Sequence, residues 1–103
     1  MAEYRKVATV SDIPDGGMKT YRLDHDQIVI CHSGGRFYAI VDECSHDAAP
    51  ISTGHLRDHE IVCPRHGARF DITSGTVTAP PAVAPIDTFE VKVEGEDIFV
   101  RLD

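Results

Sequence analysis

Residues 43–50, with the sequence ECSHDAAP, place a cysteine and a histidine two positions apart, at Cys44 and His46. A second pair follows in the sequence CPRHGARFD, as Cys63 and His66. Two thiolates and two imidazoles at such short spacing form a four-ligand set that is typical of metal binding. These pairs are the strongest chemical signal in the chain, which shows no readable nucleophile and base and no phosphate-binding glycine loop.

The way the ligands are distributed favours two metal ions over one. A zinc finger usually groups its two cysteines in one pair and its two histidines in the other, with the histidines on a helix. Here each segment supplies one cysteine and one histidine, and no stretch has the apolar period of a helix. In a two-iron site, both cysteines can bind one iron and both histidines the other. This is the ligand set of a Rieske [2Fe–2S] centre, where two histidines replace two cysteines on one iron. A structural zinc-binding module without redox activity remains the alternative.

The composition indicates one globular domain. The chain has 103 residues, of which 42% are hydrophobic and 26% are charged, enough to bury a modest core. Its formal net charge of −7 disfavours nucleic acid and anionic membranes as partners. No apolar run approaches the ~20 residues that cross a bilayer, and the N-terminus lacks the apolar core of a secretory signal. We therefore predict a single domain over residues 1–103, located in the cytoplasm, with neither nucleic acid nor a membrane as a partner.

Short segments between turn signals predict an all-β fold of eight to ten strands, in a sandwich or small barrel. The clearest candidate strands are MKTYRLD (18–24), QIVICH (27–32), RFYAIVD (36–42) and HEIVC (59–63). The C-terminal sequence TFEVKVEGEDIFVRL predicts a hairpin, in which Phe89, Val91 and Val93 share one side and are met by Ile98 and Val100.

The middle of the chain is expected to be looser than its ends. Residues 42–87 hold both Cys/His pairs and then the prolines at positions 80, 81 and 85, which favour a stiff, extended backbone. We therefore expect an outer β scaffold that carries a loop-built, metal-binding subdomain at about 42–87. The best helical candidate is SDIPDG, where Ser11 is expected to cap a single turn.

The motif CSH, followed after sixteen residues by CPRHGARFD, resembles that of the Rieske-type ferredoxins. The resemblance includes the flanking β-rich segments and the proline stretch, so it covers nearly the whole chain. It implies that Cys44 and Cys63 bind the inner iron of one [2Fe–2S] cluster, and that His46 and His66 bind the outer, more exposed iron. It also implies three antiparallel sheets, two cluster-binding loops at one tip, and a proline-rich loop that covers the cluster.

The chain departs from one branch of this family. Rieske proteins of quinol-oxidising complexes carry a disulfide between the two ligand loops, at positions that match Ala49 and Arg65 here. They also carry serine and tyrosine hydroxyls at the positions of Ala68 and Phe70. Fewer hydrogen-bond donors leave the reduced cluster less stabilised, and carboxylates such as Asp42 act in the same direction. We therefore predict a low potential, toward the lower part of the ~−150 to +300 mV Rieske range.

The resemblance implies an electron carrier with no catalytic site of its own. The leading hypothesis is the ferredoxin component of a ring-hydroxylating dioxygenase system in aromatic hydrocarbon catabolism. It would accept electrons from a NAD(P)H-dependent flavoprotein ferredoxin reductase and deliver them to the terminal oxygenase. The small Rieske subunit of assimilatory nitrite reductase, or another stand-alone Rieske carrier, is the alternative within the same chemistry.

Five further residues have simpler interpretations. Cys31 lies in an apolar run and is expected to be a buried small hydrophobe. His32, on the opposite face, is expected to be solvated, and His55 and His59 are expected to be surface histidines. Gly67, directly after His66, is interpreted as a turn residue that allows a close approach to the cluster.

Overall fold

The computed structural model describes residues 3–23, 26–45, 50–64 and 67–101. Within these residues the chain forms eleven strands and two short 3-10 helices, η1 and η2. The elements in chain order are β1 (Tyr4–Thr9), η1 (Val10–Asp12), β2 (Met18–Leu23), β3 (Asp26–Ser33), β4 (Arg36–Val41), η2 (Ile51–Thr53), β5 (His55–Arg57), β6 (Glu60–Val62), β7 (Arg69–Asp71), β8 (Val77–Ala79), β9 (Thr88–Phe89), β10 (Val91–Glu94) and β11 (Asp97–Arg101). No helix in this described part is long and apolar enough to cross a membrane.

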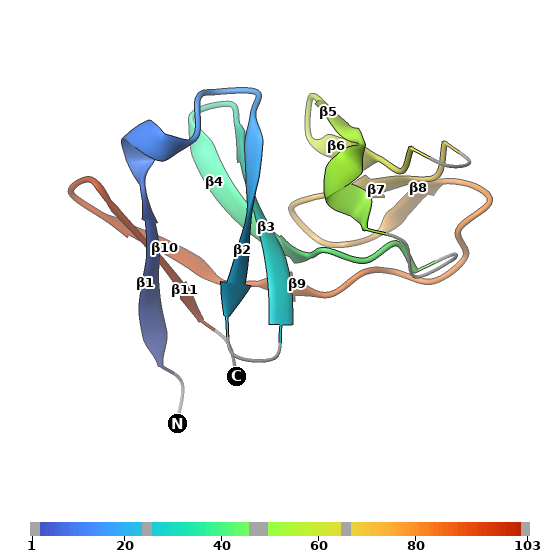
Figure 1. Ribbon diagram of the computed structural model, residues 1–103. Helices are drawn as coiled ribbons and strands as arrows, with labels where there is room; N and C mark the ends of the chain where they lie inside the picture. The colour runs from blue at the N-terminus through green and yellow to red at the C-terminus, as the bar shows by residue number, and fades with distance from the viewer. Residues whose placement is uncertain (1–2, 24–25, 46–49, 65–66, 102–103) are drawn as a thin grey trace.

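The strands form three antiparallel sheets, with the orders β1-β11-β10, β2-β3-β4-β9 and β5-β6-β7-β8. Figure 1 shows the third sheet set apart from the other two, to which the two ends of the chain contribute. The prediction of an all-β fold with three antiparallel sheets is confirmed. Over the described residues no sheet closes on itself, so the barrel alternative is wrong. The strands outnumber the predicted eight to ten because several have only two or three residues.

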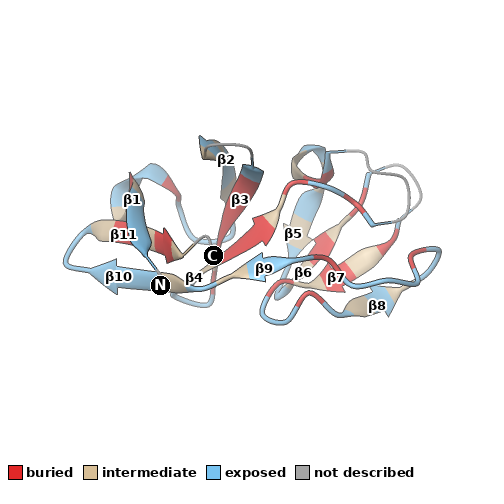
Figure 2. Cartoon of the chain, turned by 90° about the horizontal axis from the view of Figure 1, so that it is seen from below, coloured by how far each residue is buried: buried red, intermediate tan, exposed pale blue. Residues whose placement is uncertain are grey.

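Strand β3 is buried on both faces, as Figure 2 shows. Ile28 and Ile30 pack into a core between the first and second sheets. Val29 and Cys31 pack into a second core, which is shared with the third sheet. Because neighbouring residues of a strand point to opposite faces, one strand serves both cores. This double burial explains why QIVICH is a continuous apolar run rather than an alternating one.

The C-terminal hairpin forms as predicted, with one exception. In the pairing of β10 with β11, Val91 lies opposite Val100 and Val93 lies opposite Ile98. Phe89 does not belong to this hairpin, because it pairs with Ala39 of β4 in the second sheet. The chain therefore passes from one sheet to the next between Phe89 and Val91, a change that the alternating pattern of residues does not reveal.

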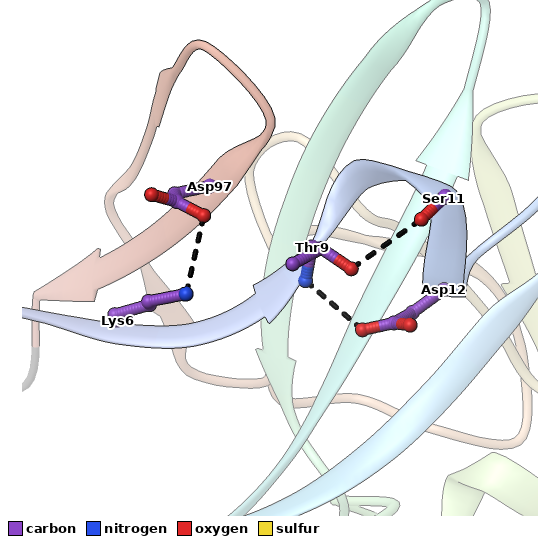
Figure 3. Close-up of polar contacts among 5 residues, drawn as sticks. All are labelled: Lys6, Thr9, Ser11, Asp12 and Asp97. Atoms are coloured by element: carbon purple, nitrogen blue, oxygen red, sulfur yellow. Dashed lines mark hydrogen bonds and ion pairs between the residues drawn. The ribbon is translucent and has the colours of Figure 1, made fainter.

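The predicted cap at Ser11 is wrong, because Ser11 lies inside the turn η1. The residue at the cap is Thr9, whose backbone is extended and whose N–H donates to the carboxylate of Asp12 at 3.0 Å. This hydrogen bond lowers the pKa of Asp12. Figure 3 shows the turn beside the ion pair of Lys6 and Asp97, 3.2 Å long, which joins β1 to β11.

Candidate metal centre

Two of the four predicted ligands lie in the same buried cluster. Cys44 follows β4 and is 0% exposed, while Cys63 follows β6 and is 1% exposed. Both belong to the core that the second and third sheets share, and neither is in a disulfide. His46 and His66 lie outside the described residues. Within the described part no group of three or more metal-binding side chains is found, so the arrangement of the complete ligand set remains a prediction.

The second ligand loop turns back on itself directly after Cys63. The backbone N–H of Cys63 donates to the carbonyl of Ala68 at 2.7 Å, and the N–H of Gly67 donates to the carbonyl of Cys63 at 3.1 Å. Gly67 has a φ of +75°, and a Cβ built there meets no atom of the described residues within 4 Å. Among the described residues, backbone conformation rather than crowding therefore requires the glycine. The turn leads into β7, where Phe70 is fully buried.

The first ligand loop is joined to the proline-rich segment. The hydroxyl of Ser45, next to Cys44, donates to the carbonyl of Ala84. The end of this segment is held by the N–H of Ile86, which donates to the carbonyl of Gly75 at 2.9 Å. A Cβ on Gly75 would lie 2.1 Å from the carbonyl oxygen of Ile86, so the two backbones are in close contact. These bonds hold the proline-rich loop beside the first ligand loop, and that the loop covers the cluster stays a prediction.

The outer side of the proline-rich loop is apolar and exposed. Val83 is 94% exposed, whereas its neighbour Ala82 is 4% exposed and packs in the core. The sequence VTAPPAVAPI, residues 77–86, contains no charged side chain, although 26% of the chain is charged. The loop therefore presents a large apolar side chain to solvent from a backbone that is anchored on both sides.

Asp42, considered from the sequence only for its charge near the cluster, is a buried residue in the structure. It is 8% exposed, and its carboxylate accepts a hydrogen bond from the amide of Gln27 and two from Ser52. A buried carboxylate with three donors has a structural role, because leaving those donors unpaired would be costly. The sequence contains no signal for this, since both partners lie ten or more positions away.

The other singled-out residues give a mixed result. Cys31 is 0% exposed, and burial raises the pKa of its thiol to about 12, which confirms the interpretation as a buried hydrophobe. His55 and His59 are exposed, as predicted. The prediction that His32 is solvated is wrong: its side chain is 14% exposed, its ring stacks on Phe37 at 4.0 Å, and Nδ1 lies 2.8 Å from a backbone carbonyl.

Comparison with known proteins decides the family. Residues 3–90 match the family described as Rieske [2Fe-2S] domain. The chain belongs to this family. Its cofactor is therefore a [2Fe–2S] cluster, and the Rieske resemblance is confirmed, whereas the zinc-module alternative finds no support. The donor set fits the cofactor, because two thiols from separate loops are buried together outside any disulfide, where they are available as iron ligands.

Individual relatives of this Rieske protein are ferredoxins. The ferredoxin component of biphenyl 2,3-dioxygenase from Rhodococcus jostii is 37% identical over 98 residues, which cover 95% of this chain and 92% of the relative. The solved ferredoxin of carbazole 1,9a-dioxygenase from Nocardioides aromaticivorans is 34% identical, with a TM-score of 0.90, and the match covers 94% of this chain and 95% of that one.

A second solved structure contains such a ferredoxin together with a partner. It is the complex of reduced oxygenase and oxidised ferredoxin in carbazole 1,9a-dioxygenase, with a TM-score of 0.88 and 32% identity, covering 94% of this chain and 91% of that one. The near-complete coverage by proteins named as ferredoxins confirms that this chain is an electron carrier rather than an enzyme.

Proposed function

We propose that this chain is the ferredoxin component of a ring-hydroxylating dioxygenase system, carrying single electrons from a NAD(P)H-dependent flavoprotein reductase to a terminal oxygenase. The observation that supports this most strongly is the similarity, over 95% of the chain, to a dioxygenase ferredoxin component. The similarity to a ferredoxin solved with its oxygenase supports the oxygenase as the electron acceptor. We place the carrier in the cytoplasm, where a reductase that uses NAD(P)H would operate.

Cys44, His46, Cys63 and His66 would hold the [2Fe–2S] cluster, which supplies one-electron transfer when bound. The protein excludes water from the two thiols, since Cys44 and Cys63 are almost completely buried. It also fixes their loops by hydrogen bonds to Ala84 and Ala68. We further propose that residues 42–87, which include the whole third sheet, form the cluster-binding subdomain of one domain over residues 1–103.

Reconstitution tests this function directly. The purified ferredoxin is combined with the reductase and oxygenase of a biphenyl dioxygenase, with NADH as the electron source. We expect the visible absorbance of the ferredoxin to bleach with NADH and reductase, and hydroxylated product to form only when all three proteins are present. Electron delivery to an assimilatory nitrite reductase but to no oxygenase would overturn the proposal in favour of the alternative carrier.

Val83 provides a test of how the oxygenase is recognised. Its apolar side chain is exposed and lies in the loop beside the first ligand loop. Such a side chain suits the core of a protein interface, because charged residues are depleted there. We expect Val83→Lys to lower kcat/KM for the ferredoxin in oxygenase turnover roughly tenfold, as loss of an interface anchor does. The matched control is Val93→Lys on β10, because Val93 is also exposed, at 43%, but lies in the first sheet. Equal effects of the two substitutions would contradict an interface at the proline-rich loop.

We also propose that the cluster has a low potential for a Rieske centre. The side chains of Ala68 and Phe70 are fully buried and offer no hydroxyl. A redox titration is expected to give a midpoint in the lower part of the ~−150 to +300 mV range. The double variant Ala68→Ser, Phe70→Tyr is expected to raise the midpoint by roughly 50 to 100 mV, the equivalent of one or two hydrogen bonds to the reduced cluster. A wild-type midpoint near the top of the range would refute this proposal.

A further inference from the structure

Asp42 is bound to the start of β3 through both its backbone and its side chain. It directly follows β4, and its N–H donates to the carbonyl of Gln27 at 2.9 Å. The side-chain amide of Gln27 in turn donates to Oδ2 of Asp42. These two contacts fix the carboxylate relative to the second sheet. Asp42 therefore marks the point at which the chain leaves that sheet for the first ligand loop, two residues before Cys44.

The same carboxylate also accepts hydrogen bonds from Ser52, at the other end of the first ligand loop. The N–H of Ser52 donates to Oδ1 at 2.8 Å, and the hydroxyl of Ser52 donates to Oδ2 at 2.9 Å. Ser52 lies in η2, next to Ile51, which is 0% exposed in the core that contains Cys44 and Cys63. The two hydrogen bonds thus join Asp42 to Ser52, ten positions later in the chain. These two residues lie before and after the segment that carries the first Cys/His pair.

The C-terminal end of η2 contacts the second ligand loop. A Cβ on Gly54 would lie 1.9 Å from the carbonyl oxygen of Val62 and 3.2 Å from Cδ of Pro64. These two residues flank Cys63 on either side. One short helix therefore connects the closure of the first loop with the backbone that carries Cys63. Any shift of η2 is expected to act on both loops, because protein interiors are close-packed.

We propose that Asp42 and Ser52 form a clasp that, through η2, positions both loops for the [2Fe–2S] cluster. This inference rests on the proposed function in one respect, the assignment of Cys44 and Cys63 as ligands. Asp42 is a positioning residue, since its carboxylate is occupied by donors of the protein itself. Its two oxygens accept three hydrogen bonds, from the N–H of Ser52, the hydroxyl of Ser52 and the side-chain amide of Gln27.

The test measures how fast the isolated holoprotein loses its cluster to an excess of iron chelator, followed by visible absorbance. Ser52→Ala removes one hydrogen bond of the clasp and leaves the carboxylate charge unchanged. Asp42→Asn keeps the shape but removes one of the two acceptor oxygens, so that the three donors of Ser52 and Gln27 no longer all have an acceptor. We expect both variants to shorten the half-life of the cluster about tenfold, the order expected for the loss of one hydrogen bond to a charged group. A changed electron paramagnetic resonance spectrum of the reduced cluster is expected as well.

A matched control separates positioning from general stability. Ser33→Ala removes a hydroxyl bond outside η2, from Ser33 to the carbonyl of Asp58 in the turn between β5 and β6. We expect this variant to keep the cluster half-life within about threefold of wild type, since the bond touches neither η2 nor the clasp. If Ser33→Ala, at an equal denaturant midpoint, shortened the half-life as much as Ser52→Ala, the clasp would be refuted.

A rescue variant tests the hydrogen-bond pattern itself. In Asp42→Asn with Gln27→Glu, donor and acceptor exchange places, so that the amide at position 42 can donate to the new carboxylate at position 27. We expect this double variant to recover the cluster half-life and spectrum, and failure to recover either would count against the clasp. The assay contains neither reductase nor oxygenase, so its outcome is independent of whether the proposed electron transfer fails. If Asp42→Asn does not fold, the cluster half-life of Ser52→Ala, compared with that of Ser33→Ala, still tests the clasp.

Discussion

Replacing Cys63 with alanine is expected to yield a folded but colourless protein, whereas replacing Cys31 with alanine is expected to leave the cluster in place. The three cysteines offer a controlled comparison, because all are at most 1% exposed and lie in the same core. Only Cys44 and Cys63 belong to the Cys/His pairs. Since each iron of the cluster needs its protein ligands, we expect Cys44→Ala and Cys63→Ala to hold less than about a tenth of the wild-type iron.

The measurements are iron and acid-labile sulfide per chain, visible absorbance, and circular dichroism as a check that the sheets are formed. Cys31→Ala controls for the loss of a buried sulfur, which creates a small cavity in the same core. Cys31 lies in β3, outside both Cys/His pairs, and is therefore not expected to serve as a ligand. A Cys63→Ala protein that kept its full iron content would show that the assignment of ligands is wrong.

The family and the central strands could be predicted because their signals are local. The two Cys/His pairs are recognised from residues a few positions apart, and β3 from a short apolar run. Cys44 and Cys63 lie in one buried core, and their role as ligands stays a prediction. The spacing of the two pairs was specific enough to indicate the whole family. Local patterns supply the type of each residue and the period of its neighbours, and these were sufficient to single out the two Cys/His pairs.

The errors concern choices that depend on distant parts of the chain. Phe89 continues the alternation of the hairpin, yet it pairs with Ala39, fifty positions earlier. Ser11 and Thr9 are both good caps, and only the backbone geometry selects Thr9. The burial of Asp42 could not be predicted, because its partner Ser52 has no sequence feature that distinguishes it. Burial of a polar residue becomes visible only when its hydrogen-bond donors have been placed in space.

Gly54 gives the second large prediction, that Gly54→Ala destabilises the fold and weakens cluster binding together. The added Cβ would lie 1.9 Å from the carbonyl oxygen of Val62, far inside van der Waals contact. This neighbour is backbone and cannot turn aside as a flexible side chain would. Either η2 or the strand end before Cys63 must therefore move. We expect the free energy of unfolding to fall by about 3 kcal/mol, at the upper end of the cost of overpacking, and the iron content to fall with it.

Gly95→Ala is the matched control for this substitution. Gly95 has a φ of +61°, and a Cβ built there meets no atom within 4 Å in the part of the chain that the structure describes. Its cost is therefore limited to left-handed backbone strain, about 1 kcal/mol, at a hairpin turn in the first sheet. Denaturant unfolding of both variants, with iron analysis, separates the two effects. We expect Gly95→Ala to keep its full cluster at a slightly lower midpoint. Gly54→Ala could instead show the same iron content and the same denaturant midpoint as Gly95→Ala. The contact between η2 and the second ligand loop would then not support the cluster site, and η2 would not link Asp42 to the loop that carries Cys63.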